Sequence, residues 1–139
     1  MAKKHFTKEE PTNILITGAA QGLGKLLAMK FAEMSIVGAV NLIVCDIRED
    51  LTDKLIEDVT LASGMKKFPH VFFHKANLAS GEEIEALWAK IIKKHGKVHM
   101  LINNAAICLG KRVDELTIQQ VKLTMDINFH SYVHLTMLF

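Results

Sequence analysis

Short apolar segments alternate with longer segments of helical periodicity along this chain. The apolar segments each have the length of a β-strand, and they read NILIT, VNLIVC, HVFFH and VHMLI at residues 13–17, 40–45, 70–74 and 98–102. Because these runs are nearly continuous rather than alternating, they favour strands covered on both faces, as in a parallel sheet with helices on each side. Strands that alternate with helices indicate βαβ units, so the pattern predicts an α/β fold.

The segments between the strands have the periodicity of amphipathic helices. Over residues 80–95 the apolar positions fall on one helical face, and they are Ile84, Leu87, Trp88, Ile91 and Ile92. Ser80 and Glu83 have the spacing of a capping box at the start of this helix, and Gly96 suits the position after its end. The same periodicity predicts another helix over residues 51–62, before Gly64.

A last helix is predicted to begin at Thr117, with Gln120 as its capping partner, and to run to or past Phe139. Its apolar residues cover most of its circumference, so we expect burial on several sides. The sequence stops there without a cap, a glycine or a polar tail. We therefore expect a chain that is cut rather than finished, and self-association of the isolated 139 residues through the uncovered apolar face.

The composition is that of one packed domain. Half of the 139 residues are hydrophobic and 23% are charged, which excludes collagen-like, low-complexity and disordered chains. A net charge of +2 is too small to indicate a nucleic acid or an anionic membrane surface as a partner. Residues 1–12 are expected to form a charged N-terminal arm that is no signal peptide, and residues 13–139 to fold. No segment has the length of a membrane span.

Cysteines and histidines show no disulfide or metal pattern. Cys45 and Cys108 stand alone, without a C-x-x-C spacing, and are interpreted as small packing residues of a reduced, cytoplasmic protein. His130 and His134 have the i, i+4 spacing of a metal-binding pair on a helix, but no third ligand lies near them in the sequence. We therefore expect no metal site.

The segment TGAAQGLG, residues 17–24, directly follows the first predicted strand and opens the first predicted helix. A glycine turn at this place lets the backbone approach a pyrophosphate, and the N–H groups and dipole at the helix start stabilise its negative charge. Side chains at Gly18 and Gly22 would stand in the way. The segment therefore predicts a dinucleotide site, with close helix–strand packing as the alternative role of the glycines.

Asp46 ends the second predicted strand, 22 residues beyond Gly24. A carboxylate at this position can accept hydrogen bonds from the adenosine ribose hydroxyls, and its charge would repel a 2′-phosphate. This favours NAD over NADP as the cofactor, although Lys25 and Arg48 are close enough in the sequence to leave NADP open. The alternative is that Asp46 is an exposed loop residue.

Three features together resemble the short-chain dehydrogenase/reductase family, and within it the hydroxysteroid and retinol dehydrogenase branch. They are the spacing T-G-x-x-x-G-x-G over residues 17–24, Asp46, and the run NNAA at 103–106 after the fourth predicted strand. The resemblance spans residues 13–139 and implies a Rossmann-like, doubly wound parallel sheet with strand order 3-2-1-4, of which only the N-terminal part is present. It also implies an NAD(P)-dependent oxidoreductase that moves a hydride between the nicotinamide and an alcohol or ketone, lipophilic in that branch, and a homo-oligomer when complete.

The resemblance implies cofactor-binding positions on four segments. They are Gly18, Ala20, Gln21, Gly22, Leu23, Gly24, Asp46, Ile47, Asn77, Leu78, Asn104, Ala105 and Ala106. Asn77 stands where the family has an Asp that contacts the adenine ring, and its amide can serve because it both donates and accepts. Ala106 replaces the family's usual glycine. Asn128 matches the catalytic asparagine that in the family helps to hold a water and a lysine for proton relay.

The Tyr-x-x-x-Lys pair that the family uses for proton transfer is not found in this sequence. Four residues after Tyr132 stands Thr136, so Tyr132 is interpreted as a packing residue. We therefore expect the chain alone to bind the dinucleotide at best and to be inactive. The alternatives are a non-catalytic, truncated or structural subunit that retains the fold, and a methyltransferase-type α/β domain, against which the run at 103–106 argues.

Overall fold

The computed structural model describes residues 11–34, 39–64 and 69–139 of the chain. Four parallel strands in this part form one sheet, in the order β3-β2-β1-β4. Their bounds are β1 (Thr12–Thr17), β2 (Val40–Asp46), β3 (His70–Lys75) and β4 (Met100–Ile102). The predicted α/β fold, the Rossmann-like sheet and the strand order 3-2-1-4 are confirmed.

Residues 1–10 of the predicted N-terminal arm lie outside the described residues. Thr12, which the prediction assigned to the arm, is already the first residue of β1 and is buried. Its N–H donates to the carbonyl of Ala39, just before β2. The strand therefore begins one residue earlier than the apolar run NILIT indicates, because a threonine fits a pleated, buried position as well as an apolar residue does.

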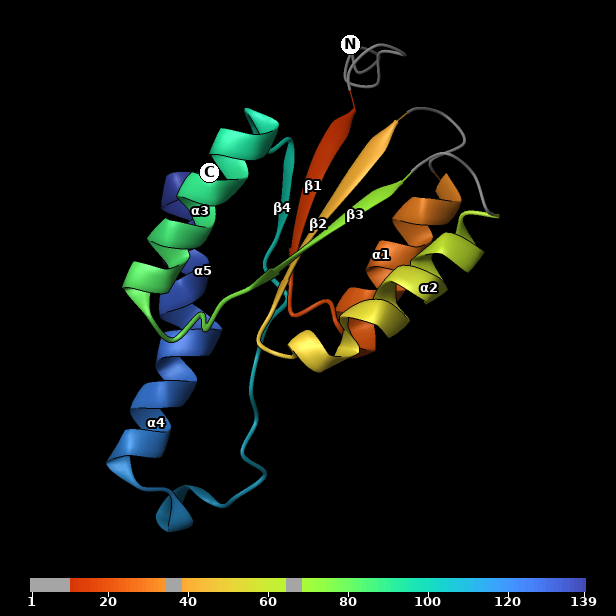
Figure 1. The fold of residues 1–139 in the computed structure, drawn as a ribbon. Coiled ribbons are helices and arrows are strands. Elements are labelled where there is room, and N and C mark those ends of the chain that lie inside the picture. The colour runs from red at the N-terminus through yellow and green to blue at the C-terminus, as the bar shows by residue number, and fades with distance from the viewer. Residues whose placement is uncertain (1–10, 35–38, 65–68) are drawn as a thin grey trace, which may run out of the picture.

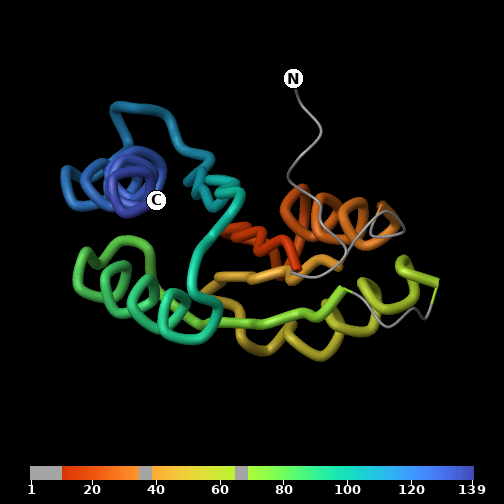
Figure 2. The backbone as a smooth tube through the Cα atoms, turned by 90° about the horizontal axis from the view of Figure 1, so that it is seen from above, coloured from red at the N-terminus to blue at the C-terminus, as the bar shows by residue number. Residues whose placement is uncertain are grey.

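Helices cover both faces of the sheet (Figures 1 and 2). One face carries α1 (Gly22–Met34) and α2 (Thr52–Ala62), and the other carries α3 (Gly81–His95) with the C-terminal helices. Alternate residues of β1 divide between these faces: Ile14 and Ile16 pack toward α1 and α2, whereas Leu15 packs toward α3. All of these side chains are fully buried. Burial on both faces explains why the strands are apolar at nearly every position.

The start of α3 differs in one contact from the predicted capping box. Ser80 is the N-cap and its Oγ accepts the N–H of Glu83 at 3.3 Å, as expected. The Glu83 carboxylate, however, does not bond to Ser80; it accepts the N–H of Asn77 at 2.8 Å. The reason is that the Ser80 N–H already donates to the carbonyl of Asn77 in a turn. Glu83 thus fixes the segment after β3 instead of closing the cap.

The predicted last helix is interrupted. After the complete capping box of Thr117 and Gln120 come α4 (Ile118–Met125), a π-helical segment η4 (Asp126–His130) and α5 (Ser131–Leu138). Short 3-10 turns, η2 (Glu49–Leu51) and η3 (Val113–Glu115), precede α2 and α4. A π segment within a helix often occurs at functional sites, and this one contains Asn128.

The expected burial of this last helix on several sides is not found in the described chain. No residue of α4 is buried, and in α5 the buried residues are Ser131 and Leu135. Large apolar side chains of α4, η4 and α5 are exposed; they are Ile118, Val121, Leu123, Met125, Phe129, Val133 and Met137. Among the described residues, none of the helices has the length and apolarity needed to cross a bilayer.

Candidate cofactor site

A pocket of about 500 Å³ lies where the carboxyl ends of the strands meet. Its wall comes from the segments that follow β1, β2, β3 and β4, together with Ile127 of η4. The chain leaves β1 to one side toward β2 and reaches β4 on the other side, and in open α/β sheets ligands bind in the crevice at such a switch point. The volume is within the range of cofactor pockets.

Most of the predicted cofactor-binding positions line this pocket. They are Gly18, Gln21, Leu23, Asp46, Ile47, Asn77, Leu78, Asn104, Ala105 and Ala106. The pocket wall does not include Ala20, Gly22 or Gly24, although they belong to the same loop. The residues that were not predicted are Cys45, Arg48, Ala76, Ile107 and Ile127. Each of them is a sequence neighbour of a predicted residue, so widening each motif by one or two positions would have found them.

Two glycines of the loop are required by close packing. Gly18 has a φ of +64°, and a Cβ there would lie 2.6 Å from the Cα of Ala105. A Cβ on Gly24 would lie 2.5 Å from Nδ2 of Asn104. Gly22 is different, because its φ is +59° but the space where its Cβ would stand is open. Gly18 and Gly24 therefore have the close-packing role that the sequence analysis gave as the alternative. Gly22 has no such role, and its missing side chain leaves the approach to the start of α1 clear.

Thr17, the first residue of the glycine motif, was not predicted as a site residue, yet it joins β1 to the segment after β4. Its Oγ1 accepts the N–H groups of Asn104 and Ala105, each at 3.0 Å, and donates to the carbonyl of Ile102 at 3.4 Å. In return, Nδ2 of Asn104 donates to the carbonyls of Thr17 at 2.9 Å and Gly18 at 3.0 Å. This network holds one wall of the pocket against the glycine loop.

Asp46 connects the end of β2 to the glycine loop. One carboxylate oxygen, Oδ2, accepts the N–H of Ala20 at 2.9 Å, and the other, Oδ1, accepts the N–H of Arg48 at 3.0 Å. Asp46 is half-buried and is the last residue of β2, so the alternative of an exposed loop residue is wrong. Ala20 is buried, with its N–H directed at Asp46. Each carboxylate oxygen has about two lone-pair sites, so both oxygens can accept one further donor.

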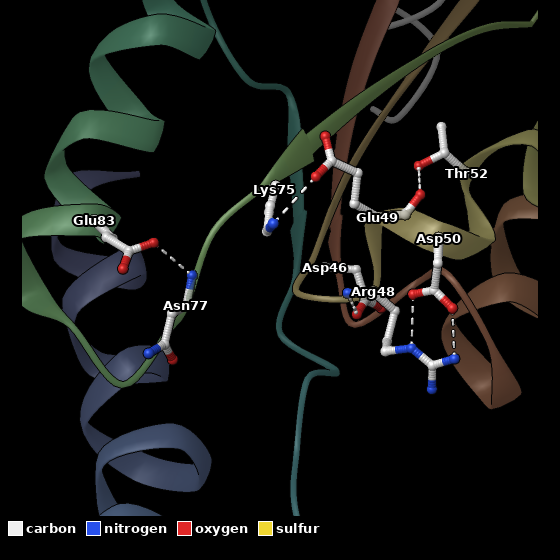
Figure 3. A network of polar contacts seen from close by, with 8 residues as sticks. All are labelled: Asp46, Arg48, Glu49, Asp50, Thr52, Lys75, Asn77 and Glu83. Carbon is white, nitrogen blue, oxygen red and sulfur yellow. Dashed lines mark hydrogen bonds and ion pairs between the residues drawn. The ribbon is translucent and has the colours of Figure 1, made fainter.

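The cations near Asp46 are already paired with carboxylates (Figure 3). Nε and Nη2 of Arg48 donate to the two oxygens of Asp50 at 2.9 and 2.7 Å. These hydrogen bonds raise the pKa of Arg48 and lower the pKa of Asp50. Lys25 pairs with Asp58 of α2, and Nζ of Lys75 lies 3.1 Å from Glu49. Lys25 and Arg48, the residues that left NADP open, thus have anionic partners within the chain.

Asn77 is held in place by its neighbours at the end of β3. Its N–H donates to Glu83, and its Oδ1 accepts the N–H of Ala79 at 3.0 Å, forming a tight turn. With Ile47 and Leu78, Asn77 makes a wall of two apolar side chains and one amide. Such a wall suits a flat heteroaromatic ring with a polar edge.

Comparison with known proteins agrees with this geometry. Residues 12–139 match the sequence model of a family described as short chain dehydrogenase. The chain belongs to this family. It is 30% identical over 120 residues to mouse (Mus musculus) epidermal retinol dehydrogenase 2, a match covering 86% of this chain and 36% of that protein. It is 28% identical over 124 residues to 7alpha-hydroxysteroid dehydrogenase of Escherichia coli K12, covering 89% of this chain and 45% of that protein.

The fold is also that of solved short-chain dehydrogenase structures. A metagenomic short-chain oxidoreductase in complex with NADP superimposes with a TM-score of 0.80 at 17% sequence identity. The match covers 96% of this chain and 57% of that one. The chain therefore spans less than two thirds of the length of each of these similar proteins.

In this short-chain dehydrogenase chain, Asn128 holds the pocket wall. Its Oδ1 accepts the N–H of Ile107 at 2.9 Å, and its Nδ2 donates to the carbonyl of the same residue at 2.8 Å. One amide side chain thus pairs with both polar groups of one residue, as a neighbouring strand would. The proton-relay role of Asn128 stays a prediction; what the structure shows is that it positions Ile107.

Tyr132 does not have the environment of a proton-transfer group. It is half-buried, and burial raises its pKa above the ordinary value. The residue four positions later is Thr136, whose hydroxyl donates to the Tyr132 carbonyl at 2.6 Å, so Tyr132 does not begin a Tyr-x-x-x-Lys motif. A tyrosine needs a lowered pKa to act as an acid or base near neutral pH.

The cysteines differ from each other. Cys45 lines the pocket and is buried, and burial, with the charges of Asp46 and Glu83, raises its pKa to about 12, so its thiol stays protonated. Cys108 is exposed, and its interpretation as a packing residue is wrong. It lies in residues 103–112, which form neither helix nor strand, and residues 108–112 of this segment are exposed.

His130 and His134, the histidine pair on the last helix, each lie beside one carboxylate. Nδ1 of His130 lies 2.9 Å from Oδ1 of Asp126, and Nε2 of His134 lies 3.5 Å from Glu85 of α3. Across residues 11–34, 39–64 and 69–139, no group of three or more side chains is arranged to hold a metal ion.

Proposed function

We propose that this chain is the cofactor-binding half of an NAD(P)-dependent oxidoreductase, and that the pocket at the strand ends is its dinucleotide site. The observation that carries the proposal is the position of Asp46. Its carboxylate lies on the pocket wall and is bonded to the glycine loop through Ala20. A ribose acceptor and a pyrophosphate loop are thus held at a fixed separation, which is what a bound dinucleotide requires.

The residues present fit the cofactor's chemistry. The N–H of Lys25 donates to the carbonyl of Gln21, so the N–H groups before it form the open amino end of α1 and can receive a pyrophosphate. Both oxygens of Asp46 keep room for ribose hydroxyls. Asn77, Ile47 and Leu78 would hold the adenine ring, and Asn104, Ala105 and Ala106 would line the path toward the nicotinamide.

Asp46 supports a preference for NAD. The negative carboxylate would face the 2′-phosphate of NADP at short range, and like charges there destabilise binding. Solved structures of this fold include a metagenomic oxidoreductase in complex with NADP and a Burkholderia phymatum enzyme in complex with NAD, so the fold accepts both cofactors and we propose that local residues decide between them.

When bound, NAD(P) would supply the site that gives or takes a hydride. The residues of this chain bind and orient it: the loop of residues 17–24 receives the phosphates, and the network of Thr17 and Asn104 fixes the wall beside it. Asn128 positions Ile107, and Cys45 contributes a neutral surface. The described residues contain no Tyr–Lys proton-transfer pair, so we propose that this chain alone binds the cofactor without turnover.

The substrate of the whole protein would be an alcohol or a ketone. The similar retinol and hydroxysteroid dehydrogenases are named for lipophilic alcohols, and we propose the same class of substrate here. The second candidate is a non-catalytic subunit that retains the fold, since these 139 residues contain no Tyr-x-x-x-Lys pair. The two differ in whether the whole protein turns over any alcohol or ketone.

Titration of the 139-residue chain with NADH, followed by the emission of the reduced nicotinamide, tests the proposal. Saturable binding that S-adenosylmethionine does not displace is expected. Absence of saturable binding, or displacement by S-adenosylmethionine, would contradict it and favour a methyltransferase-type site. The Asp114→Asn variant is a matched control, because Asp114 is an exposed carboxylate outside the pocket wall and should leave NADH binding unchanged.

A further inference from the structure

We propose that Asp50 is a specificity-determining residue of this site: by holding the Arg48 guanidinium, it keeps that cation from binding a 2′-phosphate. The inference rests on the proposed dinucleotide function. It adds a second determinant to Asp46, one that acts on a cation rather than on the ribose.

Arg48 is placed to reach the ribose end of the pocket. Its backbone N–H donates to Oδ1 of Asp46, and Arg48 is one of the residues that line the pocket. Among the described residues that line the pocket, Arg48 is the basic one and Asp46 the acidic one. Whatever controls the Arg48 side chain therefore controls the positive charge available beside the ribose.

Asp50 controls that side chain through two parallel hydrogen bonds. Nε and Nη2 of Arg48 lie 2.9 and 2.7 Å from the two oxygens of Asp50, and Figure 3 shows the guanidinium directed at Asp50. A planar guanidinium recognises a phosphate through the same fork of N–H groups that it offers to a carboxylate. A 2′-phosphate would have to displace Asp50 to use them.

No other nearby cation compensates within the described part of the chain. Lys75, at the end of β3, pairs with Glu49, and Lys25, on α1, pairs with Asp58. A 2′-phosphate at Asp46 would thus meet a carboxylate directly and, around it, cations that have carboxylate partners. This arrangement strengthens the preference for an unphosphorylated ribose.

The chain contains a matched ion pair away from the pocket. Nε and Nη2 of Arg112 lie 3.0 and 3.1 Å from the two oxygens of Asp114, with the same spacing of two residues in the sequence. Both side chains are exposed, as are those of Arg48 and Asp50. Neither Arg112 nor Asp114 lines the pocket. A variant of this pair therefore serves as the control, because it loses the same kind of ion pair away from the cofactor site.

The experiment compares the dissociation constants of NADH and NADPH for the 139-residue chain, Asp50→Asn and Asp114→Asn, by nicotinamide fluorescence. In Asp50→Asn, NADPH should bind about three- to tenfold more tightly, while NADH changes less than about twofold. The gain should shrink at about 1 M salt, where charge interactions are screened. Asp114→Asn should match the wild type. Adding Arg48→Gln to Asp50→Asn should remove the gain.

An unchanged NADH-to-NADPH ratio in Asp50→Asn overturns the inference, as does an equal gain in Asp114→Asn or a gain that survives Arg48→Gln. If the wild type binds neither NADH nor NADPH, the proposed function fails, and this inference fails with it. If the wild type binds NADH but Asp50→Asn leaves the NADH-to-NADPH ratio unchanged, only this inference fails. Asp50→Ser, compared with the wild type by circular dichroism, serves as the second variant with the same expectation, since Asp50 is exposed and its loss should not unfold the chain.

Discussion

The carboxylate of Asp46 accepts the backbone N–H of Ala20, with 2.9 Å between Oδ2 and N. This bond joins two segments that are far apart in the sequence, the end of β2 and the loop between β1 and α1. It sets the distance between the proposed ribose acceptor and the proposed pyrophosphate loop. The geometry of the site thus depends on a residue that would also contact the ligand.

Replacement of Asp46 should weaken cofactor binding and change its selectivity. Asp46→Ala removes the Ala20 bond and the ribose acceptor, so the dissociation constant for NADH should rise about tenfold or more, as expected for a lost hydrogen bond to a charged group. Asp46→Asn keeps an acceptor oxygen but loses the charge, so it should raise the affinity for NADPH relative to that for NADH, compared with the wild type. Fluorescence titration measures both. Wild-type NADH affinity in Asp46→Ala would refute the role of this residue.

Replacement of Thr17 by Val should destabilise the fold. The methyl group keeps the shape, but the part-buried N–H groups of Asn104 and Ala105 lose their acceptor, at a cost of about 1–2 kcal/mol for each, in the lower part of the range for an unpaired group. Urea unfolding should therefore show a free energy of unfolding lower by about 2–4 kcal/mol. Thr17→Ser, which retains the hydroxyl, should lose less. Equal losses in the two variants would show that the hydroxyl does not carry this contribution.

The sequence predicts the scaffold well because strand and helix signals are local. Continuous apolar runs located all four strands of the sheet to within two residues at either end, and Thr117 and Gln120 form the expected capping box. The glycine spacing and Asp46 indicated the segments that surround the pocket. Strands, helix caps and the glycine motif are each determined by residues that lie close together in the chain, so one sequence is enough to predict them.

The contacts that complete the site are not local, and the sequence did not reveal them. Thr17 acts through residues 87 and 88 positions away, and Glu83 bonds to Asn77 instead of closing its own cap. The π-helical turn that contains Asn128 has the same apolar pattern as an α-helix. The pairing of Arg48 with Asp50 follows from the local backbone of η2, which no periodicity encodes. Cys108 was misjudged because exposure depends on what covers the segment.

Acidification should destabilise the chain through His74. Burial, helped by the positive charges of Lys94, His95 and Lys90, lowers the pKa of His74 below its ordinary value. The unfolded chain therefore binds a proton more readily than the folded one as the pH falls below about 6.5, so stability is present above that pH and is lost below it. Thermal unfolding at pH 7.5 and pH 5.5 should show a smaller loss of Tm in His74→Gln than in the wild type. Equal losses would contradict this assignment.

The exposed apolar side chains of α4, η4 and α5 should drive self-association of the 139-residue chain. Large exposed apolar side chains gathered on neighbouring helical segments favour association in water unless something covers them. Light scattering at about 100 µM, high enough to reveal weak contacts, should give a mass above that of one chain. Substituting Phe129 and Met137 by Glu should shift the mass toward a monomer. A monomeric wild type at that concentration would be inconsistent with this prediction.

The central claim is that a dinucleotide binds at the carboxyl ends of the strands, between the glycine loop and Asp46. Amide chemical shifts of the isotope-labelled chain, recorded during addition of NADH, locate the contact directly. The account predicts saturable shifts at residues 18–24, 46–48, 77–78 and 104–107, with little change at residues 94–99 at the opposite end of the sheet. Shifts confined to that opposite end, or none that saturate, would contradict it.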